Sequence, residues 1–544
     1  MNTHVLLLIF AASFSWVPTS RAQVSFDRIL DADKEPENWL TYSGSILGQR
    51  HSLLNQITPA NVNDLQLQWI YQARSLQKFE ATALVVDGIM YSVQAPNDVV
   101  ALDAATGRIF WTYSYNPGRA HPCCGRVNRG LAILGDTLFM GTIDAHLVAI
   151  DAKNGRPLWN TMVARAKSGY AITHAPLVLK DKVIIGTAGG EYGIRGFIAA
   201  YDAHTGKEAW RFYTIPGPGQ PGHETWEGDS WQTGGGPVWM TGSYDPALNL
   251  TYWGVGNPSP DWNGDVRPGD NLYSDSVVAL DADTGKLKWY YQFTPHDDLD
   301  FDSVQVPVLA DIEWHGQRRK VILWANRNGF FYVLDRQTGQ FLLGKPFVEV
   351  TWASGFDQKG RPVRVPGQTS SAEGTRIYPG NPGATSWYSP SYSPRTGLFY
   401  IPAWANSSSV FVKVPVEYKE GREYAAGTAT SSIPFDWSPT PNFRKEDEGY
   451  GAVRALDPQT GERKWEFKMT DVTESGILTT ASDLLFSGGR EGYFYALDAR
   501  SGALLWKTSL GAAVISGPMT YSVGGKQYVA VNAGNCLFTF ALRQ

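Results

Sequence analysis

The sequence predicts an all-β protein, a single eight-bladed β-propeller over residues 23–544 with a tryptophan in most of its repeats. Three observations support this fold. A short motif of the type ALDxxTGxxxW recurs along the chain. Most copies lie about 50 residues apart, which is room for a four-stranded sheet. Glycine (56 residues) and aromatic residues (13%) are abundant, as expected of many short strands joined by tight turns.

The repeated motif has the chemistry of a strand followed by a tight turn. In each copy an apolar run ends in Asp, a turn with Gly follows, and a large apolar residue comes four positions after the glycine. Asp can bond to the turn backbone through its side chain, and Gly accepts a positive φ. The seven motif aspartates are Asp103, Asp151, Asp202, Asp281, Asp335, Asp457 and Asp498.

The interval from Asp335 to Asp457 spans 122 residues and is long enough for one further repeat. We expect an eighth unit there with a degenerate motif, and SPRTGLFYIP (393–402) as its remnant. Repeated four-stranded units around a channel make a β-propeller. The alternative is a multi-domain β protein whose turns resemble one another by chance.

The first 22 residues have the pattern of a secretory signal peptide. The apolar run Val5–Phe14 is too short to span a bilayer, and Ser20 and Ala22 supply small residues for cleavage near Ala22. No later segment is long and apolar enough to cross a membrane. The net charge is −5 and no basic stripe is present, so we expect no nucleic-acid partner. The mature chain is therefore predicted to be exported.

Two of the three cysteines, Cys123 and Cys124, are adjacent, and Cys536 is the third. They are either two neighbouring thiols by chance or a disulfide ring between consecutive residues. A disulfide favours Cα atoms about 4.4–6.8 Å apart, whereas a trans peptide holds neighbours at about 3.8 Å. The ring would be strained, and strain tends to persist at functional sites. An exported chain would allow the disulfide to form.

Four segments between the repeats combine glycine or proline with an acid, an amide or a tryptophan. They are residues 184–196, 234–246, 252–262 and 294–303. Taken singly, each has an ordinary explanation. Glu191 could be a solvated turn acid, Trp239 a core residue, Asn257 a turn former and Asp300 a surface charge.

Together, from about residue 38 to the C-terminus, these segments resemble the pyrroloquinoline quinone (PQQ) dependent alcohol dehydrogenases, the methanol and ethanol dehydrogenases of the bacterial periplasm. The shared motifs are CC-x₃-NRG, GGE-x-GIRG, GGG-x₂-W, GNP and PHD-x₂-D. The resemblance implies an eight-bladed propeller with tryptophan docking motifs. It also implies oxidation of a primary alcohol to an aldehyde by hydride transfer to metal-bound PQQ.

The resemblance implies that Cys123 and Cys124 form a disulfide ring against one face of PQQ, with Trp239 on the other face and Cys536 free. PQQ is planar, electron-poor and polyanionic, so it suits a flat polarisable sandwich with cationic edges. The remaining residues that match the family's cofactor contacts are Glu80, Arg129, Thr173, Gly189, Gly190 and Arg327.

Glu191 and Asn257 match the family's metal ligands, and Asp300 matches both a ligand and the catalytic base. Hard oxygen donors suit a calcium-like cation and not zinc. Asp302 matches a position that is small and uncharged in calcium-dependent members and an aspartate in lanthanide-dependent ones. A third carboxylate favours La³⁺ or Ce³⁺ on Coulomb grounds, with Ca²⁺ as the alternative. The other interpretation is that Asp302 faces solvent.

The substrate pocket departs from the best-known members at Leu299, Trp404 and Glu474, so the size of the alcohol is left open. The chain has no C-x-x-C-H haem motif, and the resemblance implies a separate soluble c-type cytochrome as electron acceptor. A homodimer is compatible with the resemblance. The rival functions are a PQQ-dependent polyol or sugar dehydrogenase and a non-catalytic binding propeller, such as an outer-membrane assembly scaffold.

Overall fold

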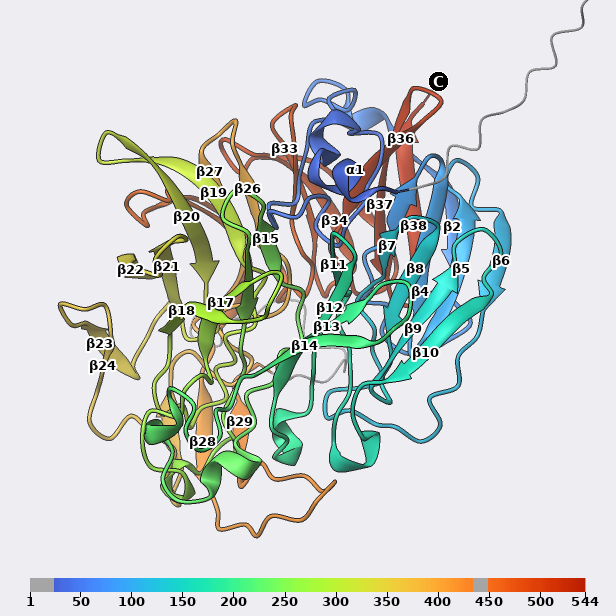
Figure 1. The fold of residues 1–544 in the computed structure, drawn as a ribbon. Helices are drawn as coiled ribbons and strands as arrows, with labels where there is room; N and C mark the ends of the chain where they lie inside the picture. Colours follow the sequence, from blue (N-terminus) through green and yellow to red (C-terminus); the bar gives the residue numbers. More distant parts are fainter. Residues whose placement is uncertain (1–23, 434–448, 544) are drawn as a thin grey trace, which may run out of the picture.

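The computed structural model describes residues 24–433 and 449–543. The predicted signal peptide, residues 1–22, lies outside these ranges. Within them the chain folds into eight antiparallel sheets, the blades of the predicted all-β propeller (Figure 1). Two small accessory sheets lie outside the blades.

Five blades follow one another along the chain. They are β3–β6 (Leu84–Val86, Ile89–Gln94, Asp98–Asp103, Ile109–Tyr113), β7–β10 (Ala132–Leu134, Thr137–Gly141, His146–Asp151, Pro157–Met162), β11–β14 (Leu177–Leu179, Lys182–Gly186, Phe197–Asp202, Glu208–Tyr213), β15–β18 (Ser243–Asp245, Leu250–Gly254, Ser276–Asp281, Leu287–Gln292) and β19–β22 (Val308–Trp314, Gln317–Ala325, Phe330–Asp335, Phe341–Pro346). Each motif aspartate in them ends the third strand.

The other three blades are less regular in sequence. They are β26, β27, β30 and β31 (Ser391–Ser393, Leu398–Ala405, Tyr450–Leu456, Arg463–Lys468); β32–β35 (Leu478–Thr480, Leu484–Gly488, Tyr493–Asp498, Leu504–Ser509), to which β1 (His51–Ser52) adds in parallel; and β36–β38 (Met519–Val523, Lys526–Ala533, Cys536–Leu542) with β2 (Leu65–Gln72).

The predicted position of the eighth unit was wrong, although the number of blades was right. The segment 393–402 forms β26 and the start of β27, in the same blade whose motif aspartate is Asp457. The eighth blade instead joins the two ends of the chain, because β2 pairs antiparallel with β38. Its outer strand comes from the N-terminal region, so no turn connects the third strand to the fourth and no motif is required.

The long interval after Asp335 holds insertions and not a blade of its own. β23 (Ala353–Phe356) pairs with β24 (Pro362–Arg364). β25 (Thr375–Ile377), β28 (Ser409–Lys413) and β29 (Gly427–Ser431) form a three-stranded sheet. Figure 1 shows β28 and β29 at the bottom of the molecule, beside the green loops of residues around 215–270. This insertion sheet therefore lies against one end of the propeller.

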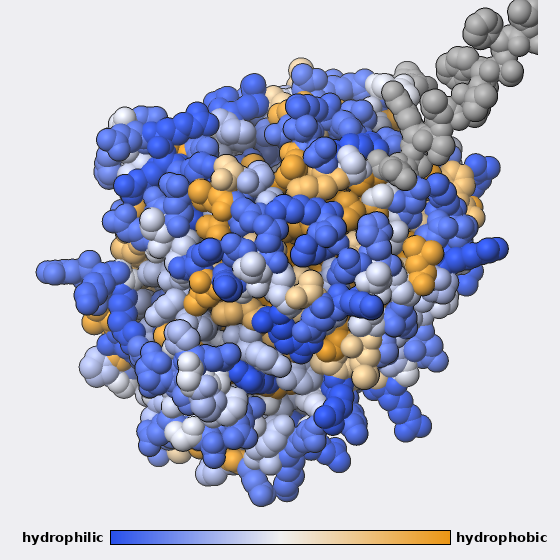
Figure 2. Space-filling model, in the orientation of Figure 1, coloured by the Kyte–Doolittle hydropathy of each residue, from blue (hydrophilic) through white to orange (hydrophobic). Residues whose placement is uncertain are grey.

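Helices are few and short. They are α1 (Phe26–Leu30) and the 3₁₀ turns η1 (Ala32–Lys34), η2 (Val62–Asp64), η3 (Ala166–Ser168), η4 (Gly190–Tyr192), η5 (His223–Thr225), η6 (Ser230–Thr233) and η7 (Gly264–Val266). In the described part of the chain, no helix has the length and apolarity needed to cross a membrane. The face seen in Figure 2 is mostly hydrophilic, with apolar residues in small groups.

The motif tryptophans join neighbouring blades. A Cβ added to Gly155 would lie 2.6 Å from the Trp111 ring, and the indole nitrogen of Trp111 donates to the carbonyl of Ala152 at 3.1 Å. The glycine is required because its φ is +74° and the ring lies directly on it. The same packing recurs at Trp69–Gly107, Trp159–Gly206, Trp210–Gly285, Trp289–Gly339 and Trp465–Gly502, and Leu343 takes the place of tryptophan at Gly461.

Candidate active site

The topology brings all the predicted site residues to one end of the propeller. In an antiparallel four-stranded blade, the connection between the second and third strands lies at the same end as the connection to the next blade. The motif turns lie at the opposite end. Connections between blades carry Glu80, Cys123, Cys124, Arg129, Thr173, Trp239, Asp300 and Asp302, and connections between second and third strands carry Gly189, Gly190, Glu191, Asn257 and Arg327.

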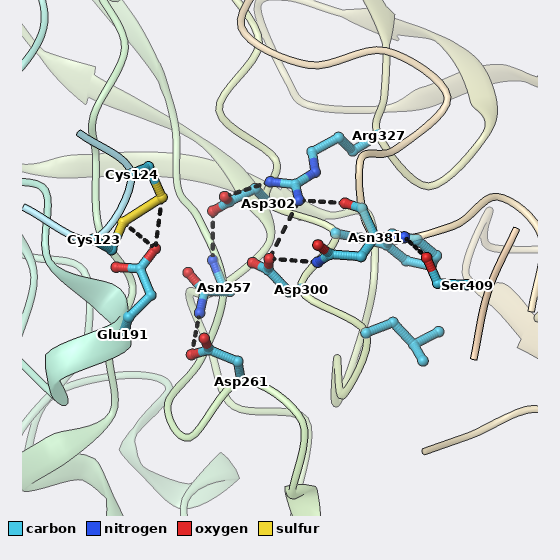
Figure 3. A network of polar contacts seen from close by, with 12 residues as sticks. Cys123, Cys124, Glu191, Asn257, Asp261, Asp300, Asp302, Arg327, Asn381 and Ser409 are labelled. Atoms are coloured by element: carbon cyan, nitrogen blue, oxygen red, sulfur yellow. Dashed lines mark hydrogen bonds and ion pairs between the residues drawn. A yellow bond between two sulfur atoms is a disulfide. The ribbon is translucent and has the colours of Figure 1, made fainter. Parts of the chain in front are cut away.

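The predicted metal ligands Glu191, Asn257, Asp300 and Asp302 lie near one another, with Asp261 and Arg327 beside them (Figure 3). We call these six residues the carboxylate cluster. Asn257 is fully buried and lies among the carboxylates. Its amide Oδ1 is buried without a hydrogen-bond partner. A Cβ on Gly190 would lie 2.7 Å from this oxygen, so glycine at 190 allows Asn257 to approach the Glu191 loop.

The predicted base, Asp300, is held through only one of its two carboxylate oxygens. Oδ2 accepts hydrogen bonds from Nδ2 of Asn381 at 2.9 Å and from Nη2 of Arg327 at 3.3 Å. Oδ1 is buried and has no partner. The arrangement therefore fixes the carboxylate and leaves one oxygen available for a cation or a proton.

Asp302 does not face solvent, because only 4% of it is exposed. Its Oδ1 accepts from the backbone N–H of Asn257 at 3.0 Å, and its Oδ2 pairs with Nη1 of Arg327 at 2.7 Å. Each carboxylate oxygen has two acceptor positions, so these partners leave room for a further donor or a cation. The structure places Asp302 in the cluster. Its role as a metal ligand stays a prediction.

The electrostatics of the cluster favour a bound cation. Burial, and next the charge of Asp302, raise the pKa of Glu191 to about 7. Burial also raises the pKa of Asp300 and that of Asp302, although Arg327 opposes both shifts. Asp261 has a raised pKa for the same main reason, burial. The four acids outnumber the guanidinium groups of Arg327 and Arg267, and a cation would lower all these pKa values.

The predicted contacts Glu80, Arg129 and Thr173 form a second group with Trp239 and Trp387, which we call the Arg129 cluster. Nη2 of Arg129 pairs with Oε2 of Glu80 at 2.9 Å, and Nη1 donates to Oγ1 of Thr173 at 3.2 Å. The guanidinium carbon lies 5.1 Å from the ring centre of Trp239 and 4.6 Å from that of Trp387. Trp239 also bonds to Asp302, and this contact opposes the rise that burial causes in the pKa of that carboxyl. Trp239 thus links the two clusters.

The adjacent cysteines are joined by a disulfide, as predicted, and Cys536 is free. Cys123 and Cys124 are both exposed. Their sulfur atoms lie 3.0 and 4.0 Å from Oε1 of Glu191. The ring therefore flanks the carboxylate cluster on the side of Glu191 (Figure 3).

Sequence reasoning missed three residues of the site. Asp261 accepts from Nδ2 of Asn257, and Asn381 contacts both Asp300 and Arg327. Buried Arg267 donates to the carbonyls of Pro260 and Asp297 and so ties together the two loops that carry the acids. One signal was available for Asn381, because the tripeptide Gly-Asn-Pro occurs both at 256–258 and at 380–382.

All three residues that depart from the family pattern are buried in the structure. Trp404 is fully buried, stacks on Tyr388 and donates to the carbonyl of Thr473. Glu474 is 5% exposed, lies 3.6 Å from Lys78, and has a pKa raised by burial. Leu299 is fully buried beside the base. These contacts show why the three positions tolerate large or charged side chains, and they leave the substrate undefined.

The buried polar atoms that lack hydrogen-bond partners indicate whether a metal ion and PQQ fit this site. Buried acceptors without a hydrogen bond occur at Oδ1 of Asn257 and Oδ1 of Asp300, which suits a hard cation. Buried donors without a hydrogen bond occur at Nε of Arg129 and Nε of Arg327, which suits a polyanion. The donor set therefore fits both a metal ion and an anionic quinone.

Comparison with known proteins agrees with this site. Residues 39–352 match the profile of the family described as glucose/ethanol/alcohol dehydrogenase, β-propeller domain, and residues 449–541 match that of the outer membrane protein assembly factor BamB. Quinohemoprotein alcohol dehydrogenase ADH IIB of Pseudomonas putida is 39% identical over 98% of this chain and 78% of its own length.

Relatives whose names refer to a lanthanide have a comparable sequence identity to this chain. The lanthanide-dependent methanol dehydrogenase of Methylacidiphilum fumariolicum is 36% identical over 96% of this chain and 89% of its own length. A solved europium-containing methanol dehydrogenase superimposes with a TM-score of 0.88 at 34% identity, covering 95% of this chain and all of that one. The chain belongs to the family of PQQ-dependent alcohol dehydrogenases.

Proposed function

We propose that the protein acts in the periplasm, where it oxidises a primary alcohol to an aldehyde and passes the electrons to a soluble c-type cytochrome. The proposed chemistry rests on the hydrogen bonding of the two carboxylate oxygens of Asp300. One of its oxygens is anchored by Asn381 and Arg327, and the other is buried and unpartnered. A carboxylate held in this way can accept a proton in a fixed direction.

When bound, PQQ supplies a quinone that accepts a hydride, and the metal ion supplies Lewis acidity. Asp300 accepts the hydroxyl proton of the alcohol on Oδ1. Arg327 stabilises the ionised form of Asp300 through its charge, as its lowering effect on the pKa of Asp300 indicates. The alcohol thus loses one proton and one hydride, and the aldehyde leaves.

The residues that would hold the two groups are those of the two clusters. Glu191, Asn257, Asp300 and Asp302 would supply oxygens to the metal ion. Arg129, Arg327, Thr173 and Glu80 would contact the edges of PQQ, Gly189 and Gly190 would let the backbone approach it, and Trp239 and the Cys123–Cys124 ring would lie against its faces. The third carboxylate of this ligand set favours a trivalent lanthanide over Ca²⁺.

The test is reconstitution of the purified protein with PQQ and either La³⁺ or Ca²⁺, followed by a dye-linked assay on a panel of alcohols, polyols and sugars. We expect oxidation of primary alcohols with La³⁺ and poor activity with Ca²⁺. Equal activity with both ions would contradict the choice of metal. Activity confined to sugars or polyols would contradict the substrate class.

Asp302→Ala tests the third carboxylate directly. We expect weaker La³⁺ binding and lower La³⁺-supported turnover, each by tenfold or more, with a smaller change for Ca²⁺, because a trivalent ion interacts more strongly with each carboxylate. The propeller should stay folded, since its blades are held together by the motif tryptophans that pack on glycines of the neighbouring blade. Unchanged turnover with La³⁺ would show that Asp302 is no part of the metal site.

A further inference from the structure

The amide of Asn257 has one defined orientation in the structure. Its Nδ2 donates to Oδ1 of Asp261 at 2.8 Å and to the carbonyl of Pro258 at the longer distance of 3.4 Å. Its Oδ1 is the buried oxygen without a partner next to Gly190. Asp261 is 2% exposed and Asn257 is fully buried. In Figure 3, Asp261 lies at one end of the Asn257 side chain, and Glu191, Asp300 and Asp302 lie around the remaining sides.

This orientation matters because the two ends of an amide have nearly the same shape and opposite hydrogen-bonding character. The ionised carboxylate of Asp261 only accepts hydrogen bonds, so Nδ2 is the end that faces it. Only the oxygen end of an amide can bind a cation. If the amide were rotated by half a turn, an NH₂ group would point into the proposed metal site.

We propose that Asp261 is a positioning residue that holds the Asn257 amide with its carbonyl oxygen towards the metal ion. The inference rests on the proposed function, since it assumes that Asn257 binds a metal there. Residues that orient metal ligands commonly affect metal affinity by 10- to 100-fold.

The backbone on both sides of Asp261 is fixed, as a positioning role requires. The carbonyl of Pro260 accepts from Nη2 of Arg267 at 2.9 Å. The N–H of Trp262 donates to the carbonyl of Ala425 at 3.0 Å. Asp261 therefore cannot follow the Asn257 amide if that amide rotates, and the hydrogen bond between them selects one orientation.

Two other roles would place an acid here: a direct ligand, or a negative charge that attracts the ion over a distance. Asp261→Asn and Asp261→Leu separate them. The Asn variant keeps an oxygen that can accept from Nδ2 of Asn257 and loses the charge, whereas Leu has the same branched shape and loses both. We expect Asp261→Leu to weaken La³⁺ binding 10- to 100-fold and Asp261→Asn to weaken it less than threefold.

The measurement is La³⁺ and Ca²⁺ binding by titration calorimetry on the purified full chain with PQQ, so that no activity is needed. The matched control is Asp275→Asn, which removes a fully buried carboxylate that acts electrostatically on Asp300 and Asp302 and that has no hydrogen bond to Asn257. Equal losses for Asp261→Asn and Asp261→Leu, or no loss for Asp261→Leu, would overturn the proposal.

A second experiment uses Asn257→Asp, because a carboxylate has two equivalent oxygens and needs no orientation. In that background we expect Asp261→Leu to leave La³⁺ affinity unchanged or to raise it. A further 10-fold loss would mean that Asp261 acts as a ligand or a charge, and would overturn the positioning role. Asn257→Leu with unchanged metal affinity would instead refute the proposed metal site, and the inference with it.

Discussion

The two clusters of the site differ in how completely the protein balances their charges. In the Arg129 cluster, one guanidinium pairs with one carboxylate, and both side chains are less than 10% exposed. In the carboxylate cluster, Arg327 pairs with Asp300 and Asp302 and acts on Glu191, and Arg267 acts on Asp261, so two guanidinium groups face four acids. Burial raises the pKa values of all four acids in the carboxylate cluster.

The difference indicates what each cluster needs in order to be stable. In the Arg129 cluster the charges of Arg129 and Glu80 offset each other, although Nε of Arg129 is buried without a hydrogen bond. The carboxylate cluster is completed only by protons or by a cation, which is the physical basis for placing the metal there. Removal of one charged side chain should therefore lower the free energy of unfolding in the Arg129 cluster. Removal of one acid from the carboxylate cluster should not lower it.

The largest expected effect is on catalysis, from Asp300→Asn. Loss of a positioned base lowers turnover by about 10²- to 10⁴-fold, measured at saturating PQQ and metal. Because an excess negative charge is removed, the melting temperature of the metal-free protein should not fall. Bound PQQ is measured by absorbance, and its loss in parallel with turnover would contradict the role of base. Asp275→Asn is the control for removal of a buried charge.

Next in size is the loss of stability expected from Arg129→Met. This change leaves Glu80 buried and unpaired, which reduces the free energy of unfolding by about 3–5 kcal/mol. Denaturant unfolding of the metal-free and PQQ-free protein measures it. The double variant with Glu80→Gln should recover much of the loss. A decrease below about 1 kcal/mol would mean that the Arg129–Glu80 pair contributes no more to stability than an exposed ion pair does.

A smaller effect is expected in the pH dependence of the metal-free protein. The pKa of Glu191 is about 7 in the folded protein, against an ordinary value of 4.5. Between these values the folded state binds more protons than the unfolded state, so stability falls as the pH rises from 4.5 to 7. We expect a higher melting temperature at pH 5 than at pH 7.5, relative to Glu191→Gln. Saturating metal should abolish this difference, and a stability that rises over this range in both proteins would contradict the assignment.

The smallest change in stability is expected from Cys123→Ala. The disulfide closes a ring between consecutive residues, so it restricts the unfolded chain very little, and we expect a change below about 1 kcal/mol. PQQ binding should weaken, because the ring lies beside the carboxylate cluster. Titration of the variant with PQQ measures this effect. A large loss of stability with unchanged PQQ affinity would show that the disulfide is structural.

The fold was readable from the sequence wherever the chain repeats a local signal. Asp and Gly at each motif form a turn through local hydrogen bonds and a positive φ, and the apolar residue four positions on packs on the next blade. The eighth blade lacked such a signal because β2 and β38 are more than 460 residues apart, and their pairing is a property of the closed ring.

The repeat, seven of the eight blades and the types of residue at the site follow from the sequence alone. Residue identity and local spacing were enough for this, since carboxylates, an amide and adjacent cysteines can be recognised directly in the amino-acid sequence. Which atoms have partners depends on how the chain folds in three dimensions. The contacts of Asn381 with Asp300 and of Asp261 with Asn257 depend on loops that long-range packing holds in place, and hydrogen bonds of this kind have no signature in the local sequence.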